Sequence, residues 1–354
     1  MNHAQRLDAL RGVIEAPLLV SKAPNLRYLT GFTGSNGFLL VRPQAGATFV
    51  TDGRYGELAE VLVAALADTD LVVYTSGMWD VFRSLVEGID TLELESDDVT
   101  WEFATEFTSE TGMEVAAGGG AVERQRRTKD GDEVASLEAA AGAGDKAFSA
   151  LAGLAEPHLT EAELGWRLID EMRRAGGQAA AWEPIVAAGS GASIPHYRSG
   201  SKPIGNGLLL LDYGCTVVGY HSDMSRTVWL SGSPGEEMAG VYRAVAEAQE
   251  VGLATVAPGT TCDAVDEAVR KVLRGYGYEE QFLHSTGHGV GLEIHEPPWV
   301  RHGNDDELKP GDVITVEPGV YLPGIGGVRI EDMVLVTETG TTVLTHSSKE
   351  PTAP

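Results

Sequence analysis

The chain has 354 residues, of which 43% are hydrophobic, and a formal net charge of −26 at pH 7. This length exceeds the size at which one hydrophobic core usually stops growing, so the chain is predicted to form two domains. The acidic balance excludes a nucleic-acid partner, because no basic stripe is present to contact phosphates, and it favours the attraction of divalent cations.

The number of cysteines and the length of the apolar runs indicate the cellular location expected for the protein. Two cysteines, Cys215 and Cys262, are too few for a disulfide framework and are expected to be buried as small apolar side chains. Residues 1–11 are polar and lack the apolar centre of a signal peptide, and no apolar run is long enough to span a bilayer. A cytoplasmic protein without a membrane partner is therefore expected.

Residues 1–122 alternate short strands and helices, which is typical of a smaller α/β domain. Residues 25–35 are rich in turn formers and indicate a turn. Asp52 and Arg54 favour a turn and helix start over a functional role. The expected helices are 2–15, 54–66, 78–87 and 99–111, and the expected strands are 17–20, 38–41, 47–51, 70–74, 90–94 and 113–116.

Three consecutive glycines at 118–120 mark the domain boundary, and residues 123–354 form the second predicted domain. Arg124, Arg126, Arg127 and Lys129 follow the glycines, and a solvated linker with a first helical turn is the favoured interpretation. Helices are expected at 130–155, 160–175, 235–256 and 261–275, the second opened by a Thr160/Glu163 capping box. Strands at 182–187, 208–213, 223–230, 313–318 and 327–336 complete an α+β domain with a curved, largely antiparallel sheet backed by helices.

Residues 284–295 contain three of the nine histidines, His284, His288 and His295. Histidine is the commonest metal ligand and the side chain best suited to proton transfer near neutral pH. Glycines at 287, 289 and 291 would let the backbone pass close to a bound group. This stretch alone is equally compatible with a glycine-rich turn that carries surface histidines.

Two aspartates provide the first carboxylate pair. Asp212 lies in an apolar strand, where an unpaired buried charge would cost several kcal/mol. If the following strand forms a hairpin that turns near Val217 and Val218, Asp223 faces Asp212 across it. Two ionised carboxylates at this separation need a cation, which could be a metal ion or Arg226.

Glu317 and Glu331 form a second pair around a glycine-rich turn centred on Gly324. Two carboxylate pairs and a histidine cluster in one domain favour a metal site. Oxygen-rich ligands suit two divalent ions, with Mn²⁺ preferred over a thiolate-type zinc site.

Such a site would hydrolyse an amide or an ester with a hydroxide that bridges the two metals. Glu317 is the candidate proton shuttle, because a glutamate can both ligate a metal and transfer protons. His196, in a loop, and His295 are candidates to donate hydrogen bonds to the oxyanion or the substrate.

The residues at these positions resemble the five ligands of the pita-bread dinuclear metallopeptidases, which include methionine aminopeptidase, aminopeptidase P and prolidase. The resemblance covers about residues 123–345 and rests on five runs: Leu211–Gly214, Ser222–Thr227, Gly287–Gly291, Glu317–Gly319 and Arg329–Asp332. It implies a pita-bread fold and two divalent ions per subunit, Mn²⁺ first and Co²⁺ or Zn²⁺ as alternatives. The implied metal ligands are Asp212, Asp223, His288, Glu317 and Glu331, and the implied substrate-binding residues are His196, His284, His295 and Arg329.

The N-terminal half resembles that of bacterial Xaa-Pro peptidases at residues 25–37 and 51–55. This implies hydrolysis of the bond before proline, with an Xaa-Pro dipeptidase (prolidase) favoured and an Xaa-Pro aminopeptidase (aminopeptidase P) on longer peptides as the alternative. A non-catalytic pita-bread binding module is a further alternative, and a homodimer is expected. Many prolidases carry an arginine where this chain has Trp299, with Arg301 nearby, which puts carboxylate recognition by this loop in doubt.

Overall fold

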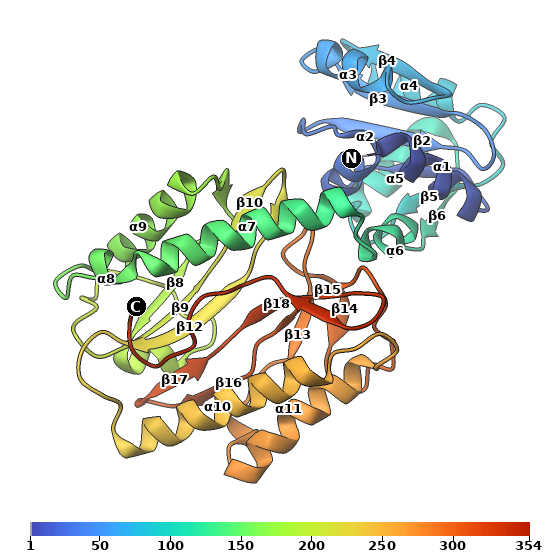
Figure 1. Ribbon diagram of the computed structural model, residues 1–354. Helices are drawn as coiled ribbons and strands as arrows, with labels where there is room; N and C mark the ends of the chain where they lie inside the picture. The colour runs from blue at the N-terminus through green and yellow to red at the C-terminus, as the bar shows by residue number, and fades with distance from the viewer. Residues whose placement is uncertain (1) are drawn as a thin grey trace. The chain divides into compact units, whose positions relative to one another are not determined.

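The computed structural model describes residues 2–354, which divide after Arg126 into two units (Figure 1). The boundary predicted after residue 122 falls within helix α6 (Ala121–Arg127), a few residues before this division. Each unit has its own sheets and core. No described helix is long and apolar enough to cross a membrane.

The first unit is an α/β structure built on one six-stranded sheet with the order β4-β3-β2-β1-β5-β6. β1 is entirely buried and pairs antiparallel with β2 and parallel with β5, which makes the sheet mixed. Its strands are β1 (Leu18–Val20), β2 (Gly37–Val41), β3 (Ala47–Asp52), β4 (Thr69–Tyr74), β5 (Leu92–Glu95) and β6 (Val115–Gly118). Its other helices are α1 (His3–Val13), α2 (Ala23–Thr30), α3 (Gly56–Val63), α4 (Met78–Leu85) and α5 (Trp101–Thr111).

The turn predicted for residues 25–35 is wrong in its first half, because α2 occupies it. Pro24 lies in the first turn of this helix and Gly31 caps its end in a left-handed conformation. Proline near the start and glycine just past the end are the usual marks of a short helix. The turn formers therefore delimit a helix.

The second unit contains the long helices of the chain. α7 (Gly131–Ser149) and α9 (Glu161–Arg174) both begin with capping boxes, and the Thr160/Glu163 box is the predicted one. The remaining helices are α8 (Leu151–Leu154), α10 (Glu236–Thr255), α11 (Cys262–Tyr276) and the 3-10 turns η1 (Gly189–Ser193) and η2 (Glu279–Gln281).

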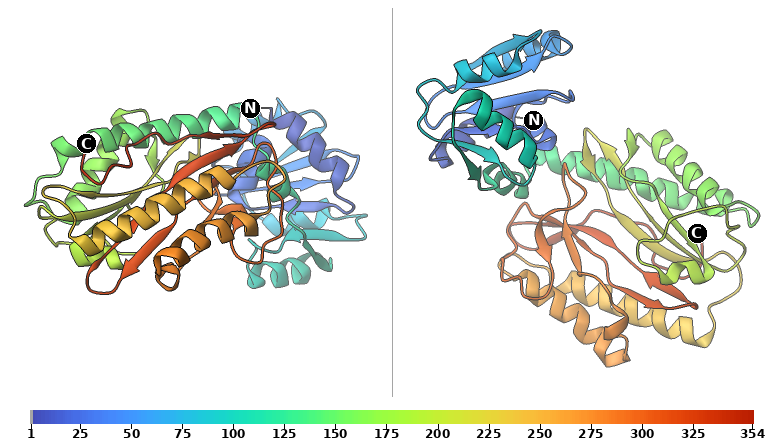
Figure 2. Two further views of the ribbon diagram at one scale, coloured as in Figure 1. Left: turned by 60° about the horizontal axis from the view of Figure 1, so that its bottom comes forward. Right: turned by 180° about the vertical axis from the view of Figure 1, so that it is seen from behind.

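The strands of the second unit lie between α7 and α9 on one side and α10 and α11 on the other (Figures 1 and 2). They form four small sheets, β11-β10-β7, β12-β9-β8, β14-β13-β15-β18-β19 and β16-β17. Every pairing between these strands is antiparallel, in agreement with the predicted, largely antiparallel sheet, and a single-residue parallel bridge joins Trp229 to Thr352. The strands are β7 (Ala179–Ala180), β8 (Ile185–Ala188), β9 (Leu208–Tyr213), β10 (Cys215–Val217), β11 (Tyr220–His221), β12 (Met224–Trp229), β13 (Gly287–Gly289), β14 (Glu296–Val300), β15 (Val313–Val316), β16 (Gly319–Leu322), β17 (Gly326–Arg329), β18 (Asp332–Val336) and β19 (Thr341–Val343).

Strand β9 contains an unbroken run of leucines because both of its faces are buried. Leu209 and Leu211 pack in the cluster that contains residues of α7 and α9, and Leu208 and Leu210 pack in the cluster that contains residues of α10. Asp212 continues the second alternation and projects on the same side of the sheet as Leu210. The alternation therefore directs this carboxylate toward the interior between the two helix layers.

The C-terminal segment is held against the sheets of this unit by a buried ion pair. Arg226 and Asp332 are 1% and 0% exposed, and the guanidinium Nη2 lies 2.7 Å from the Asp332 carboxylate. Arg226 also donates hydrogen bonds to the carbonyls of Ser347 and Ser348, at 2.9 and 3.1 Å. Lys349 approaches the other carboxylate oxygen of Asp332. The network joins β12, β18 and the last residues of the chain.

Replacing Arg226 with methionine should lower the free energy of unfolding by about 3–5 kcal/mol, because a buried carboxylate loses its main partner. The measurement is the midpoint of urea unfolding, followed by circular dichroism. Arg173→Met is the matched control, since Arg173 is 59% exposed and its nearest carboxylate is 3.9 Å away. Its expected effect is within about 0.5 kcal/mol. Equal midpoints for the two variants would contradict the role of the buried pair.

Candidate functional site

One cavity of about 270 Å³ in the second unit brings together all of the predicted site residues. Its lining contains four carboxylates, four histidines, one guanidinium and an apolar wall. The lining residues are Trp182, Ile185, Pro195, His196, Asp212, Asp223, His284, Ser285, His288, Ile294, His295, Trp299, Glu317, Arg329 and Glu331. They come from segments far apart in the sequence.

The prediction that Asp212 and Asp223 face each other across a simple hairpin is wrong. The pairing of β9 with β12 sets Asp212 opposite Ser225, and Asp223 lies just before β12. Residues 215–221 form the end of this hairpin, and β10 within it also pairs with β7. The turn is centred on Val218 and Gly219, one position later than expected, and this shifts every pairing of the hairpin by two residues. Both aspartates still reach the same cavity.

Arg226 is not the cation between the two aspartates, because it binds Asp332 and the C-terminal segment. Arg329 lies beside Asp212 instead, with 2.5 Å between its Nη2 and the carboxylate. Arg329 also donates from Nε to the Ser225 hydroxyl at 2.8 Å and from Nη1 to the Tyr321 hydroxyl at 2.7 Å. Among the described lining residues it is the single lysine or arginine side chain.

The second predicted hairpin is confirmed. β16 pairs antiparallel with β17, with Gly319 opposite Arg329 and the turn at Gly324. Continuing the same register by two residues sets Glu317 opposite Glu331. Both glutamates leave their strands at the cavity, where they are 15% and 2% exposed respectively.

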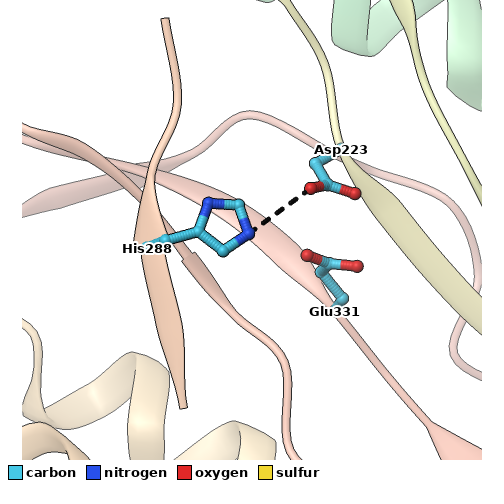
Figure 3. A group of neighbouring side chains, drawn as sticks. All are labelled: Asp223, His288 and Glu331. Atoms are coloured by element: carbon cyan, nitrogen blue, oxygen red, sulfur yellow. Dashed lines mark ion pairs between the residues drawn. The ribbon is translucent and has the colours of Figure 1, made fainter. Parts of the chain in front are cut away.

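Asp223, His288 and Glu331 point toward one another from three separate segments (Figure 3). Their potential ligand atoms all lie within 4.8 Å of one another. His288 Nε2 is 3.6 Å from Asp223 and 3.5 Å from Glu317. The other ring nitrogen, Nδ1, lies 3.0 Å from the carbonyl of Gly289, which can only accept a hydrogen bond. Nδ1 therefore carries the proton and leaves the Nε2 lone pair facing the carboxylates.

The charges in this cavity fit a set of metal ligands. Burial, followed by repulsion from the neighbouring carboxylates, raises the pKa of Asp223 and of Glu317 well above their ordinary values and that of Glu331 to about 8. Burial lowers the pKa of His288 to about 4, so the ring is neutral. Four carboxylates facing one guanidinium are short of positive charge, and divalent cations would supply it.

The other three histidines line the cavity without joining the group formed by Asp223, His288 and Glu331. His284 Nε2 lies 2.8 Å from the Tyr321 hydroxyl, and burial lowers its pKa to about 3. His295 is exposed, and its ring packs edge-on against His288 with 4.3 Å between centroids. Partial burial lowers the pKa of His295. His196 is exposed at the loop that follows η1.

Two residues that hold the site together escaped the sequence reasoning. The Ser225 hydroxyl donates to Glu331 at 2.7 Å and accepts from Arg329, and the Tyr321 hydroxyl contacts both Arg329 and His284. Both lie on strands of the predicted hairpins and are buried. Alternation along those strands was the available signal, because Tyr321 and Glu317 are an even number of residues apart.

Comparison with known proteins identifies both parts of the chain. Residues 135–338 match metallopeptidase family M24, and residues 11–128 match the creatinase/prolidase N-terminal domain. The first match covers the strands and helices that carry every lining residue of the cavity.

The similarity to individual proteins extends over nearly the whole chain. The Xaa-Pro dipeptidase of Pyrococcus horikoshii is 33% identical over 94% of this chain and 93% of its own length. The structure of an Xaa-Pro dipeptidase from Bacillus anthracis superposes with a TM-score of 0.94 at 34% identity and covers 99% of both chains. That of an X-Pro aminopeptidase from Thermotoga maritima has a TM-score of 0.87 at 31% identity and covers 98% of this chain and 99% of that one.

The expected architecture, a pita-bread unit preceded by a smaller α/β domain, is therefore confirmed. The sequence match, the agreement in fold and the cluster of buried carboxylates around one neutral histidine lead to a single assignment: the chain belongs to metallopeptidase family M24.

Proposed function

We propose that the chain hydrolyses the peptide bond before proline and acts as an Xaa-Pro dipeptidase. The observation that carries this proposal is the convergence of four carboxylates and the neutral His288 on one cavity. Asp212, Asp223, His288, Glu317 and Glu331 would hold two divalent metal ions. When bound, these ions would supply Lewis-acid polarisation of the substrate carbonyl and a nucleophile derived from water.

The protein's own hydrogen bonds orient the carboxylates. Ser225 holds one oxygen of Glu331, and Arg329 holds one oxygen of Asp212, so each carboxylate keeps its other oxygen for a cation. Tyr321 and Ser225 fix the guanidinium of Arg329 in turn. This support fixes the ligand atoms before metal or substrate binds.

Glu317 is the group proposed to move the proton. Its Oε1 lies 3.5 Å from His288 Nε2, and its Oε2 lies 3.8 Å from His284 Nδ1. A carboxylate in this position would take the proton from the attacking water and deliver it to the nitrogen of the leaving proline. The carbonyl carbon gains oxygen, the C–N bond breaks, and the imino acid leaves protonated.

His295 and His196 are proposed to donate hydrogen bonds to the carbonyl oxygen, which gains negative charge as the nucleophile attacks. His295 lies at the edge of His288 and therefore close to the reacting bond. A neutral imidazole retains one N–H that can donate to an oxyanion. His284, fixed by Tyr321, and Arg329 are proposed to complete the binding site for the substrate.

Proline as the residue after the cleaved bond is supported by the cavity wall and by the similar proteins. Trp182, Ile185, Ile294 and Trp299 line the cavity with apolar surface that suits a rigid pyrrolidine ring. The relatives from Pyrococcus horikoshii and Bacillus anthracis are named Xaa-Pro dipeptidases. A non-catalytic binding module would have no use for the carboxylate cluster.

A second candidate function is that of an Xaa-Pro aminopeptidase on longer peptides. Trp299 supports it, because a tryptophan lines the cavity where the resemblance leads one to expect an arginine for the free carboxylate of a dipeptide. The similar protein from Thermotoga maritima is named an X-Pro aminopeptidase.

Three finer features are also part of the proposal. Mn²⁺ as the metal is supported by the oxygen-rich ligand set. A cytoplasmic location is supported by the two cysteines, which are free and buried. A homodimer rests on the resemblance to Xaa-Pro peptidases alone.

Substitution of a proposed ligand should remove both metal and activity. Asp223→Ala and His288→Ala are expected to bind less Mn²⁺ than the parent protein and to lose more than about 10²-fold in kcat, because even residues that only orient ligands cost 10–100-fold. Metal content is measured after dialysis, and activity on Ala-Pro. Turnover like that of the parent protein in either variant would contradict the ligand assignment.

The histidines beside the metal site should behave differently. His295→Ala and His196→Ala are expected to retain the metal and to lose about 10²–10³-fold in kcat, the usual effect of removing one donor to an oxyanion. The same metal analysis and kinetics provide the test. Loss of metal in these variants would show that they are ligands, and the proposed division of roles would then be wrong.

Substrate length separates the two candidate functions. The full chain, loaded with Mn²⁺ and also stripped of metal, is assayed on Ala-Pro and on Ala-Pro-Ala. Metal-dependent cleavage of Ala-Pro alone is expected for the dipeptidase. A higher kcat/KM for Ala-Pro-Ala would select the aminopeptidase, and hydrolysis of both without metal would contradict the metallopeptidase mechanism.

A further inference from the structure

Lys129, the last residue of the basic segment, is buried, so the prediction of a solvated linker is wrong at this position, while Arg124 is exposed and α6 provides the predicted helical turn. The Lys129 side chain is 0% exposed, and its Nζ lies 2.8 Å from Oε1 of Glu296, which is 4% exposed. Lys129 Nζ also donates to the carbonyl of Arg127 at 3.1 Å. None of these contacts is used by the metal site or by the substrate contacts proposed above.

Glu296 lies directly under the turn that joins β13 to β14. Its Oε2 accepts a hydrogen bond from the backbone N–H of Glu293 at 3.3 Å. A Cβ atom at Gly291 would lie 2.3 Å from Oε1 of Glu296, so glycine is required where the turn crosses the carboxylate. The turn of residues 291–296 is therefore packed onto the carboxylate that Lys129 holds.

This turn carries His295, the residue directly before Glu296. The far end of the turn is fixed independently, because the carbonyl of Gly291 accepts a hydrogen bond from the backbone N–H of His221 at 2.9 Å. On the other side, Glu296 pairs with Gly289 at an irregularity in the register of β13 and β14. His295 thus projects between an anchored turn and an irregular strand, and its ring meets His288 edge-on.

We propose that Lys129 is a positioning residue for His295 and that it acts through the buried carboxylate of Glu296. The inference rests on the catalytic role proposed for His295. A buried ion pair has few alternative arrangements, because separating the charges would leave each without a partner in a medium of low polarity. The pair would therefore hold the turn in one conformation and the imidazole at one distance from the substrate carbonyl.

The decisive experiment is a double-mutant cycle between Lys129→Met and His295→Ala in the full Mn²⁺-loaded chain. Lys129→Met alone is expected to lower kcat on an Xaa-Pro dipeptide by about 10–100-fold, with KM and metal content close to those of the parent protein. In the His295→Ala background it should lower kcat no further, because its effect passes through the imidazole that has been removed.

The outcomes separate the inference from the function on which it rests. A loss of kcat on Lys129→Met that is equally large with and without His295 would overturn the positioning role. An unchanged kcat in His295→Ala would instead overturn the proposed role of His295 itself, whatever Lys129 does.

A second variant keeps the test valid if Lys129→Met folds poorly. Lys129→Met combined with Glu296→Gln leaves no unpaired buried charge, and the Gln oxygen still accepts from Glu293. A low kcat is expected here together with a recovered melting temperature, and recovery of both quantities would show that the pair only stabilises the fold.

Arg127→Met is the matched control from the same segment. Arg127 binds the buried Asp312 through two hydrogen bonds of 2.9 and 2.8 Å and makes no described contact with residues 291–296. This variant should lower the melting temperature and retain the kcat of the parent protein. A kcat loss equal to that of Lys129→Met would overturn the specific link to His295.

Discussion

Repulsion between buried carboxylates is the constraint on which the second unit depends. Asp212, Asp223, Glu317 and Glu331 share one cavity with a single guanidinium, so their negative charges are not balanced by the side chains around them. A fold normally avoids this arrangement, because desolvated like charges oppose compaction. Without metal, protonation relieves the repulsion, as the raised pKa values of Asp223, Glu317 and Glu331 indicate. Bound divalent cations would relieve it with the carboxylates ionised, and the arrangement of Asp223, His288 and Glu331 suits such ions.

The sheets place the four carboxylate residues at or near the ends of strands. Asp212 lies near the end of β9, Asp223 just before β12, and Glu317 and Glu331 just outside the β16–β17 hairpin. At such positions the backbone is fixed by its ladder while the side chain projects past the last pair. Ser225 and Arg329 then cross-link two of the four carboxylates, so the first hairpin orients a residue of the second. Precision at the site arises from pairing between strands that are distant in the sequence.

The sequence predicted the composition of the site better than its geometry. The turn at Gly324 and the alternation of β9 are local features, and they correctly indicated which side chains converge. The pairing of Asp212 with Ser225 depends on the exact position of the turn at Val218 and Gly219, and the flanking strands β10 and β11 are too brief to produce a periodic pattern that would locate it. The contacts of Arg226 and of Lys129 join residues more than a hundred positions apart, and the spacing of one sequence contains no information on them.

With the roles proposed for His288 and His295, the histidine-rich stretch would provide both a metal ligand and a separate hydrogen-bond donor. Gly287 packs against β15, where a Cβ would lie 1.9 Å from the carbonyl of Thr315, so the glycines bring strand against strand. That close approach fixes His288 in the strand with Nδ1 on a carbonyl and Nε2 free for metal. His295 lies beyond the turn. The carbonyl of Gly289, which fixes the tautomer of His288, makes no described contact with the ring of His295. Its orientation must come from the turn itself, and the turn lies on a carboxylate whose cation comes from the first residues of the unit. Lys129, near the start of the second unit, would then determine the position of the His295 imidazole through Glu296.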